Sequence, residues 1–336
     1  MPLQQESPTA GVELTAPVPF DHPYWRGLRG DIVFGPIIWV TAMGAPLVRP
    51  LFPGPVDIIG DVHGEFDALR DLLRCMGYRE DGIHPEGRRL VFAGDLTDRG
   101  PDNIAVVNFV RTLVEADPPR AQVTLGNHDL NLALSHKRAH NEWFFAESPD
   151  RQQQVREFLR SLPIVLERPD LRVVHACWNR EMVDLARSAD DVIGFYKLHA
   201  ERIRHQNDRE PQLDEIARRL NLQNRNPVKL LTSGPERRAS APFETGGKVR
   251  QEERVEWWTD YTDPVWCVFG HYAIPTDQKH FFGKAVCIDF GGGYRALERS
   301  APGFTGTYTT RLGAARFPRH GGSAELPRPY AQRIVG

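Results

Sequence analysis

The sequence predicts an α/β fold built around a parallel sheet. Short apolar runs alternate with amphipathic stretches between residues 56 and 126, and each apolar run stops at glycines and polar side chains. This alternation is typical of βαβ units, which place parallel strands side by side with right-handed crossovers. A charged, helix-like stretch then interrupts the strand pattern, which returns near the C-terminus. Together these observations predict one α/β domain with a mainly helical insertion.

The first elements follow in a regular order. Apolar runs at 56–60, 88–94 and 121–126 predict three buried strands. Between them, apolar residues at helical spacing over 66–76 and 104–114 predict two helices. The order strand, helix, strand, helix, strand is what a parallel core requires.

The rest of the chain is organised differently. The segment "PIVLERPDLRVVHA" (163–176) predicts a β-hairpin. Residues 181–262 are charged with scattered apolar positions, and predict a helical cap inserted in the domain. Strand character returns at 265–270, 285–290 and 305–317. We expect one domain over 51–336, preceded by an N-terminal extension over 1–50 that is rich in Pro, Gln and Ser near its start.

Composition excludes several classes of protein. The net charge of -2 provides no field for a nucleic acid duplex or an anionic membrane. The longest apolar run, residues 32–43, contains Gly35 and Pro36 and is too short to span a bilayer. The N-terminus has no signal-peptide pattern, and the 4 cysteines form no CxxC pair. We therefore expect a cytoplasmic protein with reduced thiols, without a nucleic acid duplex or a membrane as partner.

Side chains able to bind metals stand where the predicted strands end. Asp61 and His63 follow the first strand in "VDIIGDVHG", and Asp95 follows the second in "GDLTDRG". Ligands of α/β sheets bind at the carboxyl ends of the strands. The further candidates at such ends are Asp98, Arg99, Asn127, His128, Asp129, His175 and His271. A mixture of carboxylate, imidazole and amide suits Mn, Fe, Co or Zn better than Ca or Mg.

Each candidate also has a simpler interpretation. Asp61 or Asn127 alone could form a turn or cap a helix, and the neighbouring glycines could be ordinary turn residues. However, five apolar runs in this one chain each end at a potential metal ligand. Turn formation does not require that coincidence, so we interpret the set as a metal-dependent active site.

The order of these motifs resembles the signature of the calcineurin-like metallophosphoesterases. The motifs, between residues 56 and 271, are "GDVHG", "GDLTDRG", "GNHD", "VVHA" and "FGH". They are most similar to the branch that contains phosphoprotein phosphatases and symmetrical diadenosine tetraphosphatases. The resemblance implies a four-layer α/β/β/α sandwich and a binuclear centre of two divalent metal ions. Manganese is the expected metal, with Fe, Zn, Co or Ni as alternatives.

The resemblance further implies two metal sites that share one ligand. Asp95 would bridge both ions, since its carboxylate offers two oxygens. Asp61 and His63 would complete the first site, and Asn127, His175 and His271 the second. A metal pair of this kind polarises a phosphoryl group and activates water.

For the reaction, the resemblance implies a proton donor and a phosphate-binding arginine. His128 would protonate the leaving oxygen, with Asp98 orienting its ring. Arg99 would bind the phosphate, and Asn127 would also contact it. The chemistry agrees, because imidazole can donate a proton near neutral pH and a guanidinium binds two phosphate oxygens at once.

A second phosphate-binding arginine is expected in the segment before His271. Spacing does not separate the candidates Arg237, Arg238, Arg250 and Arg254. We predict Arg237 and Arg254 as substrate-binding residues. A solvated surface charge is the alternative for each of them.

The motifs give conflicting signals about the substrate. "GHYA" lacks the second histidine found in many phosphodiesterases and nucleases, which disfavours a nuclease. "GNHDL", with Asp129, is more similar to the diadenosine tetraphosphatases, whereas "GDLTDRG", with Asp98, is more similar to the protein phosphatases. The substrate could therefore be a phosphorylated small molecule, a nucleotide or a phosphoprotein.

From these signals we predict a phosphatase. It would hydrolyse phosphate monoesters, on phosphoproteins or small molecules, by direct attack of a metal-bridging hydroxide. The alternative is a hydrolase of dinucleoside polyphosphates, such as diadenosine tetraphosphate. A more distant alternative is an inactive binding or scaffold protein. The sequence leaves open the native metal and the oligomeric state.

Overall fold

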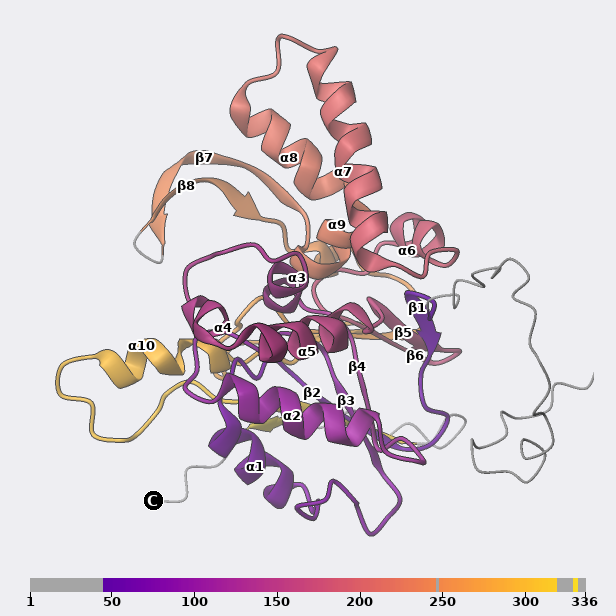
Figure 1. Ribbon diagram of the computed structural model, residues 1–336, viewed down its shortest axis with the longest axis vertical. Coiled ribbons are helices and arrows are strands. Elements are labelled where there is room, and N and C mark those ends of the chain that lie inside the picture. Colours follow the sequence, from indigo (N-terminus) through magenta and orange to yellow (C-terminus); the bar gives the residue numbers. More distant parts are fainter. Residues whose placement is uncertain (1–44, 246–247, 319–328, 332–336) are drawn as a thin grey trace, which may run out of the picture. The chain divides into compact units, whose positions relative to one another are not determined.

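The computed structural model describes residues 45–245, 248–318 and 329–331 (Figure 1). Most of the extension predicted over 1–50 lies outside the described residues. Its last residues, Val48–Pro50, form strand β1, which pairs in parallel with β5. The sheet therefore begins at Val48, ahead of the domain boundary predicted at residue 51.

One sheet contains the predicted parallel strands, in the order β13-β12-β2-β3-β4. Its strands are β2 (Val56–Ile59), β3 (Arg89–Phe92), β4 (Ala121–Val123), β12 (Gly313–Phe317) and β13 (Pro329–Ala331). The two connecting helices are α1 (Phe66–Cys75) and α2 (Asn103–Val114). Strands β2, β3 and β4 are parallel, and β12 pairs antiparallel with β2. The last strand signal, at 305–317, thus forms a strand only over its final residues.

The second sheet has the order β1-β5-β6-β9-β11-β10. Its remaining strands are β5 (Val165–Arg168), β6 (Leu171–Val174), β9 (Trp266–Phe269), β10 (Phe281–Phe282) and β11 (Ala285–Cys287). Strands β5 and β6 form the predicted antiparallel hairpin, while β6, β9 and β11 run parallel. The carboxyl ends of these parallel strands carry His175 and His271.

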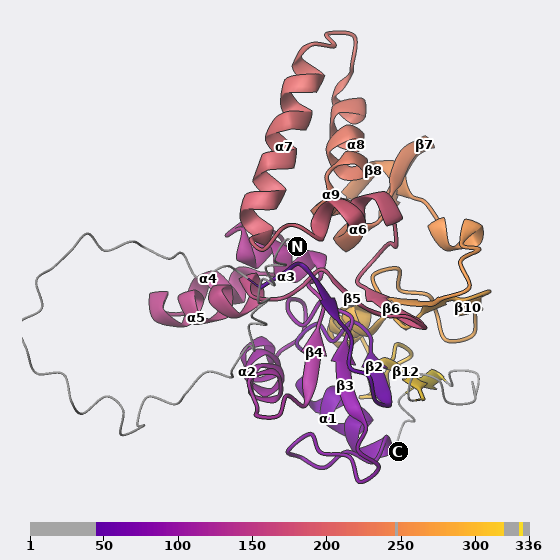
Figure 2. The ribbon, with the colours of Figure 1, turned by 90° about the vertical axis from the view of Figure 1, so that its right-hand side faces the viewer.

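The two sheets pack face to face. Ile58 of β2 and Val91 of β3 share a buried cluster with Val173 and Val268 of the other sheet. Their neighbour Ile59 points to the opposite face and joins a second cluster, which includes residues of α1 and α2. Successive side chains of a strand point to opposite faces, so each sheet is covered on both sides. The predicted four-layer α/β/β/α sandwich is confirmed, with α1 and α2 lying beside β2–β4 (Figure 2).

Four further helices belong to the sandwich part of the described chain. They are α3 (Asn127–Ala133), α4 (Glu142–Ala146), α5 (Pro149–Arg160) and α10 (Arg295–Ser300). Helix α3 begins at a residue of the "GNHD" motif, so its N-terminus lies at the strand ends. Among the described residues, no helix is long and apolar enough to cross a membrane.

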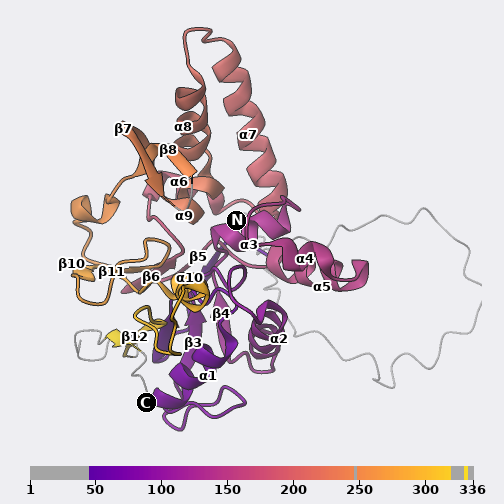
Figure 3. The same ribbon diagram turned by 90° about the vertical axis from the view of Figure 1, so that its left-hand side faces the viewer.

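The insertion combines helices with a long hairpin. The helices are α6 (Arg180–Ala186), α7 (Val192–Asp208), α8 (Glu215–Arg225) and α9 (Pro227–Ser233). Asn226 caps α9, because its side chain accepts hydrogen bonds from the backbone N–H groups of Val228 and Lys229. Strands β7 (Glu236–Thr245) and β8 (Lys248–Arg254) then form an antiparallel hairpin next to α8 (Figure 3). The sequence pattern predicted the helices of this segment but not the hairpin.

Candidate metal centre and active site

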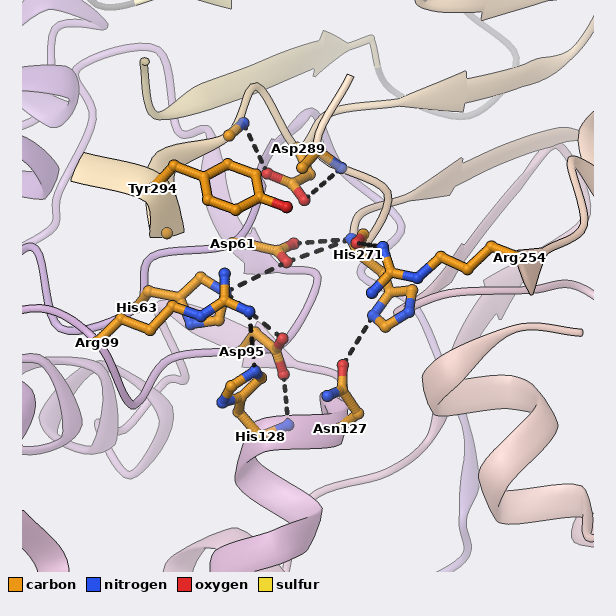
Figure 4. Close-up of a pocket in the computed structure, with 13 residues that line it drawn as sticks. Asp61, His63, Asp95, Arg99, Asn127, His128, Arg254, His271, Asp289 and Tyr294 are labelled. Atoms are coloured by element: carbon orange, nitrogen blue, oxygen red, sulfur yellow. Dashed lines mark hydrogen bonds and ion pairs between the residues drawn. The ribbon is translucent and has the colours of Figure 1, made fainter. Parts of the chain in front are cut away.

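The candidate side chains come together where strands of both sheets end (Figure 4). Asp61 and His63 follow β2, and Asp95 follows β3. Asn127 opens α3 after β4, while His175 and His271 follow β6 and β9 of the second sheet. Most of these residues line one small polar pocket, and His175 lies fully buried beside it. Side chains far apart in the sequence thus form a single site.

The backbone is strained where it delivers these ligands. His63, Asp95 and His271 have φ angles of 47°, 49° and 69°, in the left-handed region that residues other than glycine rarely adopt. Such conformations cost on the order of 1–3 kcal/mol each and cluster at functional sites. The strain is compatible with a site whose geometry the surrounding fold enforces.

Two glycines of the motifs are required by close packing against the carboxylates. A Cβ on Gly126 would lie 2.1 Å from Asp95 Oδ1, and a Cβ on Gly270 would lie 2.1 Å from Asp61 Oδ1. Neither position could hold alanine without displacing a predicted metal ligand. The glycines of "GNHD" and "FGH" are therefore more than turn residues.

Ligand atoms form two groups that share Asp95. The first group is His63, Asp95 and His128, and the second is Asp95, His175 and His271. Within each group, the ligand atoms lie within 4.8 Å of one another. Asn127 Oδ1 is 2.7 Å from His271 Nδ1 and 3.2 Å from His175 Nε2, so it belongs to the second group. His63 Nε2 lies 3.8 Å from Asp61 Oδ2 and 3.6 Å from Asp95 Oδ2, which adds Asp61 to the first.

Backbone carbonyls orient two of the imidazoles. His63 Nδ1 lies 2.9 Å from the carbonyl oxygen of Thr97, and His175 Nδ1 lies 2.8 Å from that of Ala93. A proton on each Nδ1 would donate to these carbonyls and leave Nε2 free as a ligand facing the site. Metal-binding histidines use the same outer hydrogen bonds to fix the ring.

Electrostatics indicate that the site is built for a cation. Burial, together with Asp289 and Asp95, raises the pKa of Asp61 well above its ordinary value. Burial also opposes ionisation of Asp95, but His175 and other histidines beside it hold the pKa of Asp95 well below its usual range. Burial alone would lower the pKa of His175, yet Asp95 and Asp61 raise it to about 10. The crowded carboxylates therefore draw positive charge to the centre of the site.

The other imidazoles favour the form that binds metals. Burial and the nearby Arg99 lower the pKa of His63 well below its ordinary value. Burial and Arg254 do the same to the pKa of His271. Neutral imidazole is the metal-binding form. Nitrogen and oxygen donors in two groups, with one shared carboxylate, fit a pair of divalent ions.

His128 lies between an aspartate and an arginine. Its Nδ1 lies 2.7 Å from Asp98 Oδ2, and its Nε2 lies 3.3 Å from Arg99 Nη2. The backbone N–H of His128 donates to Asp95 Oδ1 at 2.8 Å, which ties the start of α3 to the shared carboxylate. Asp98 and Arg99 both have left-handed backbones, with φ of 73° and 71°. The structure thus groups these three predicted residues at the rim of the metal-ligand cluster.

The structure separates the two arginines selected from the sequence. Arg254, at the end of β8, lines the pocket and donates from Nη1 to the carbonyl oxygen of His271 at 2.9 Å (Figure 4). Arg237 does not line this pocket. Its exposed guanidinium pairs at 2.6 Å with Glu253, which lies directly opposite on the hairpin. Arg237 is thus placed as a surface charge, the alternative given for it above. Its position in β7 directs the side chain to Glu253 on the neighbouring strand.

Two of the pocket-lining residues that were not among the predicted site residues, Asp289 and Tyr294, have polar side chains. Asp289 is 4% exposed, and its oxygens accept hydrogen bonds from the backbone N–H groups of Ala273 (2.7 Å) and Gly291 (2.9 Å). Tyr294 lies opposite Arg99, whose guanidinium is 5.7 Å from the ring centre. The available signal was "CIDFGGGY", another apolar run that ends in a carboxylate and glycines.

Comparison with known proteins gives one consistent family. Residues 54–290 match the family described as calcineurin-like phosphoesterase. The asymmetrical bis(5'-nucleosyl)-tetraphosphatase PrpE of Bacillus velezensis is 40% identical over 294 residues, which cover 82% of this chain and 94% of that protein. The symmetrical bis(5'-nucleosyl)-tetraphosphatase of Methylococcus capsulatus is 30% identical over 258 residues, covering 69% of this chain and 86% of that protein.

A solved structure shares the fold. A protein serine/threonine phosphatase from Saccharomyces cerevisiae superimposes with a TM-score of 0.52 at 17% identity, over 87% of this chain and 85% of that one. The family match covers the strands from β2 to β11 and every candidate metal ligand from Asp61 to His271. The chain therefore belongs to the calcineurin-like phosphoesterase family and is a hydrolase.

Proposed function

We propose that this chain hydrolyses dinucleoside tetraphosphates with the help of two divalent metal ions, manganese being the first choice. The observation that carries the hydrolytic part is the pair of ligand groups that share Asp95. The substrate class is supported by the relatives described above, which are named as bis(5'-nucleosyl)-tetraphosphatases. This reverses the order of our two sequence-based alternatives.

The metal ligands would divide as the motifs imply. Asp61 and His63 would hold one ion with Asp95, and Asn127, His175 and His271 would hold the other with Asp95. When bound, two such ions polarise a phosphoryl group and lower the pKa of water. The chain contributes the outer hydrogen bonds from Thr97 and Ala93 and the strained turns that aim the ligands.

Two arginines would bind the phosphate. Arg99 and Arg254 line the pocket and approach it from opposite sides (Figure 4). Guanidinium groups bind phosphate oxygens in pairs and neutralise their charge without losing a proton. In a polyphosphate chain, the two side chains could contact the same phosphate or neighbouring ones.

His128 would donate a proton from Nε2 to the leaving oxygen. The Asp98 carboxylate would accept a hydrogen bond from Nδ1–H of His128 and stabilise the protonated ring. The other nitrogen of the ring, Nε2, faces Arg99. Substrate must displace the Arg99 contact, so binding of phosphate by Arg99 would free Nε2 to reach the leaving group. General acid catalysis of this kind contributes typically ~10²–10⁴-fold to the rate.

The Asp98–His128 pair also supports a second candidate substrate class, the phosphate monoesters. An alkoxide or phenolate is a poorer leaving group than a nucleoside phosphate, so it depends more on protonation. A buried Asp98 that orients His128 provides that protonation. We keep monoester hydrolysis, on small molecules or phosphoproteins, as the alternative activity of this site.

Parallel assays on metal-reconstituted protein test the proposal. Diadenosine tetraphosphate, p-nitrophenyl phosphate and a phosphoserine peptide would be compared at equal concentration with added Mn²⁺. We expect the highest kcat/KM on diadenosine tetraphosphate and no activity in Asp95→Asn. Chromatography of the nucleotides would show whether cleavage is symmetrical or asymmetrical. A higher kcat/KM on either monoester would instead support phosphatase activity.

A further inference from the structure

The Asp98 carboxylate has a second partner that lies outside the pocket. One oxygen, Oδ2, faces His128 Nδ1 at 2.7 Å. The other, Oδ1, accepts a hydrogen bond of 2.9 Å from the indole Nε1–H of Trp143. The Asp98 side chain is 0% exposed, so solvent does not compete for either oxygen. With one N–H donor on each oxygen, the carboxylate is held against rotation as well as displacement.

Packing on both sides of Trp143 fixes the direction of its indole. Before it, the buried side chain of Asn141 accepts from the backbone N–H of Arg138 (2.9 Å) and donates to the carbonyl oxygen of His136 (3.0 Å). After it, Phe144 is 0% exposed, and its ring meets the Trp143 ring edge to face at 5.7 Å. The short helix α4 therefore presents the indole N–H from a well-packed base.

The loop between α3 and α4 also supports the strained backbone of "TDRG". Asp98 and Arg99 both have left-handed backbones, which need external contacts to persist. The backbone N–H of Arg99 donates to the carbonyl oxygen of His140 at 3.4 Å, and Trp143 binds the Asp98 side chain. One contact from this loop and one from α4, which follows it, thus hold these neighbouring residues.

We propose that Trp143 is a positioning residue for the proton donor. Its indole N–H fixes Asp98, and Asp98 fixes the His128 ring with Nε2 at the pocket. Trp143 does not line the pocket, so it should influence proton donation and not substrate binding. The inference rests on the proposed function, in which His128 protonates the leaving group.

Trp143→Phe tests the role, because phenylalanine keeps an aromatic ring and removes only the indole donor. On phenyl phosphate, which has a poor leaving group, kcat should fall roughly tenfold, a part of the ~10²–10⁴-fold worth of general acid catalysis. KM, bound metal and kcat on p-nitrophenyl phosphate should change little. Trp266→Phe is the matched control. Trp266 begins β9, and the site residue His271 follows the opposite end of that strand, so Trp266 lies away from the site. An equal loss on both esters would overturn the proposal.

A double-mutant comparison separates this role from general destabilisation. In a His128→Asn background, Trp143→Phe should cause no further loss of kcat on phenyl phosphate, because the indole acts only through that ring. If the two substitutions instead reduced kcat by independent factors that multiply, Trp143 would not act through His128 and the proposal would be contradicted. If His128→Asn by itself shows no dependence on the leaving group, the proposed role of His128 fails, and the role of Trp143 fails with it. If His128→Asn behaves as expected but Trp143→Phe does not reduce kcat on phenyl phosphate, only the positioning role of Trp143 is rejected.

A measurement without turnover covers the case in which Trp143→Phe does not fold. A ¹H–¹⁵N spectrum of the wild-type protein would report its indole N–H groups, of which the chain has 7. An N–H that donates to a buried carboxylate resonates downfield, so one indole signal should move upfield in Asp98→Asn. If no indole signal responds to Asp98→Asn, the hydrogen bond does not exist in solution and the proposal is wrong.

Discussion

The backbone N–H of His271 donates to both carboxylate oxygens of Asp61, at 3.1 and 3.2 Å, across 210 positions of sequence. Asp61 follows β2 of one sheet, and His271 follows β9 of the other. The contact therefore joins the carboxyl ends of both sheets at the candidate metal centre. Any ion held by ligands from both sheets would strengthen that connection.

Metal binding should stabilise the fold measurably. A ligand that binds only the native state at 100 times its Kd adds about 2.7 kcal/mol to the free energy of unfolding. Mn²⁺ should therefore raise the Tm of metal-stripped protein by several degrees, and Asp95→Asn should remove most of this increase. Differential scanning fluorimetry and elemental analysis would measure both effects. Finding at most one ion per chain in Mn-reconstituted wild type would contradict the binuclear centre.

Arg254 and Arg237 make a matched pair for phosphate binding. Arg254→Ala should reduce kcat/KM by about 10–100-fold, as expected for loss of a charged hydrogen bond worth roughly 1.5–3 kcal/mol. Arg237→Ala should leave kcat/KM within about twofold, because Arg237 pairs with Glu253 on the exposed hairpin. Steady-state kinetics on diadenosine tetraphosphate would decide. Equal losses in the two variants would show that the hairpin acts as a whole.

Arg99→Lys separates a phosphate contact from a structural ion pair. Lysine keeps the charge but cannot provide a planar pair of donors, so kcat/KM should fall strongly and inhibition by inorganic phosphate should weaken. The Tm should stay near that of wild type. Unchanged phosphate inhibition together with a lower Tm would identify Arg99 as a structural residue.

Asp289 should control metal affinity without being a predicted ligand. Its oxygens hold the backbone of Ala273 and Gly291, and Ala273 lies just beyond His271. Asp289→Ala should therefore weaken Mn²⁺ binding by about 10–100-fold, the usual effect of losing an outer contact at a metal site. Asp277→Ala is the control, because Asp277 is exposed and lies, like Ala273, between β9 and β10. Calorimetric titration with Mn²⁺ would measure both, and equal affinities would rule out this role.

The Arg172–Asp263 pair predicts a pH dependence away from the site. Burial alone would raise the pKa of Asp263, but hydrogen bonds from Arg172 and the Val265 backbone lower it below the ordinary value of 3.8. A lowered native pKa stabilises the fold above the unfolded pKa, and this contribution is lost as the pH falls through the native value. Asp263→Asn should thus lower Tm at pH 7 but progressively less below pH 3.8. Exposed Asp260→Asn should show no such convergence in the same thermal scans.

The parallel strands could be predicted from sequence because their physical cause is local, whereas the four-layer sandwich was implied by the resemblance to a family. Residues such as Ile58 and Ile59 are apolar in succession, which indicates a strand buried on both faces. Glycines and polar residues after each strand then indicated the common edge. Motif order supplied the candidate ligands, and the structure brings those side chains together.

The missed features depend on partners distant in sequence. The β7–β8 hairpin has few buried apolar residues, so no alternating pattern revealed it, and its register determined which arginine reaches the pocket. Trp143 and Asp289 contact Asp98 and Ala273, which lie 45 and 16 positions away. No local pattern marks a residue whose role is to hold another residue's side chain or backbone.

Strand β12 has a consequence for synthesis on the ribosome. It lies antiparallel between β2 and β13, so β2 gains its second neighbour only when the chain has been translated to Phe317. Until then, every candidate metal ligand can already have emerged while β2 remains an open edge, able to pair with another nascent chain. Translation that stops after residue 290, where the family match ends, should therefore yield aggregates even though the catalytic residues are complete.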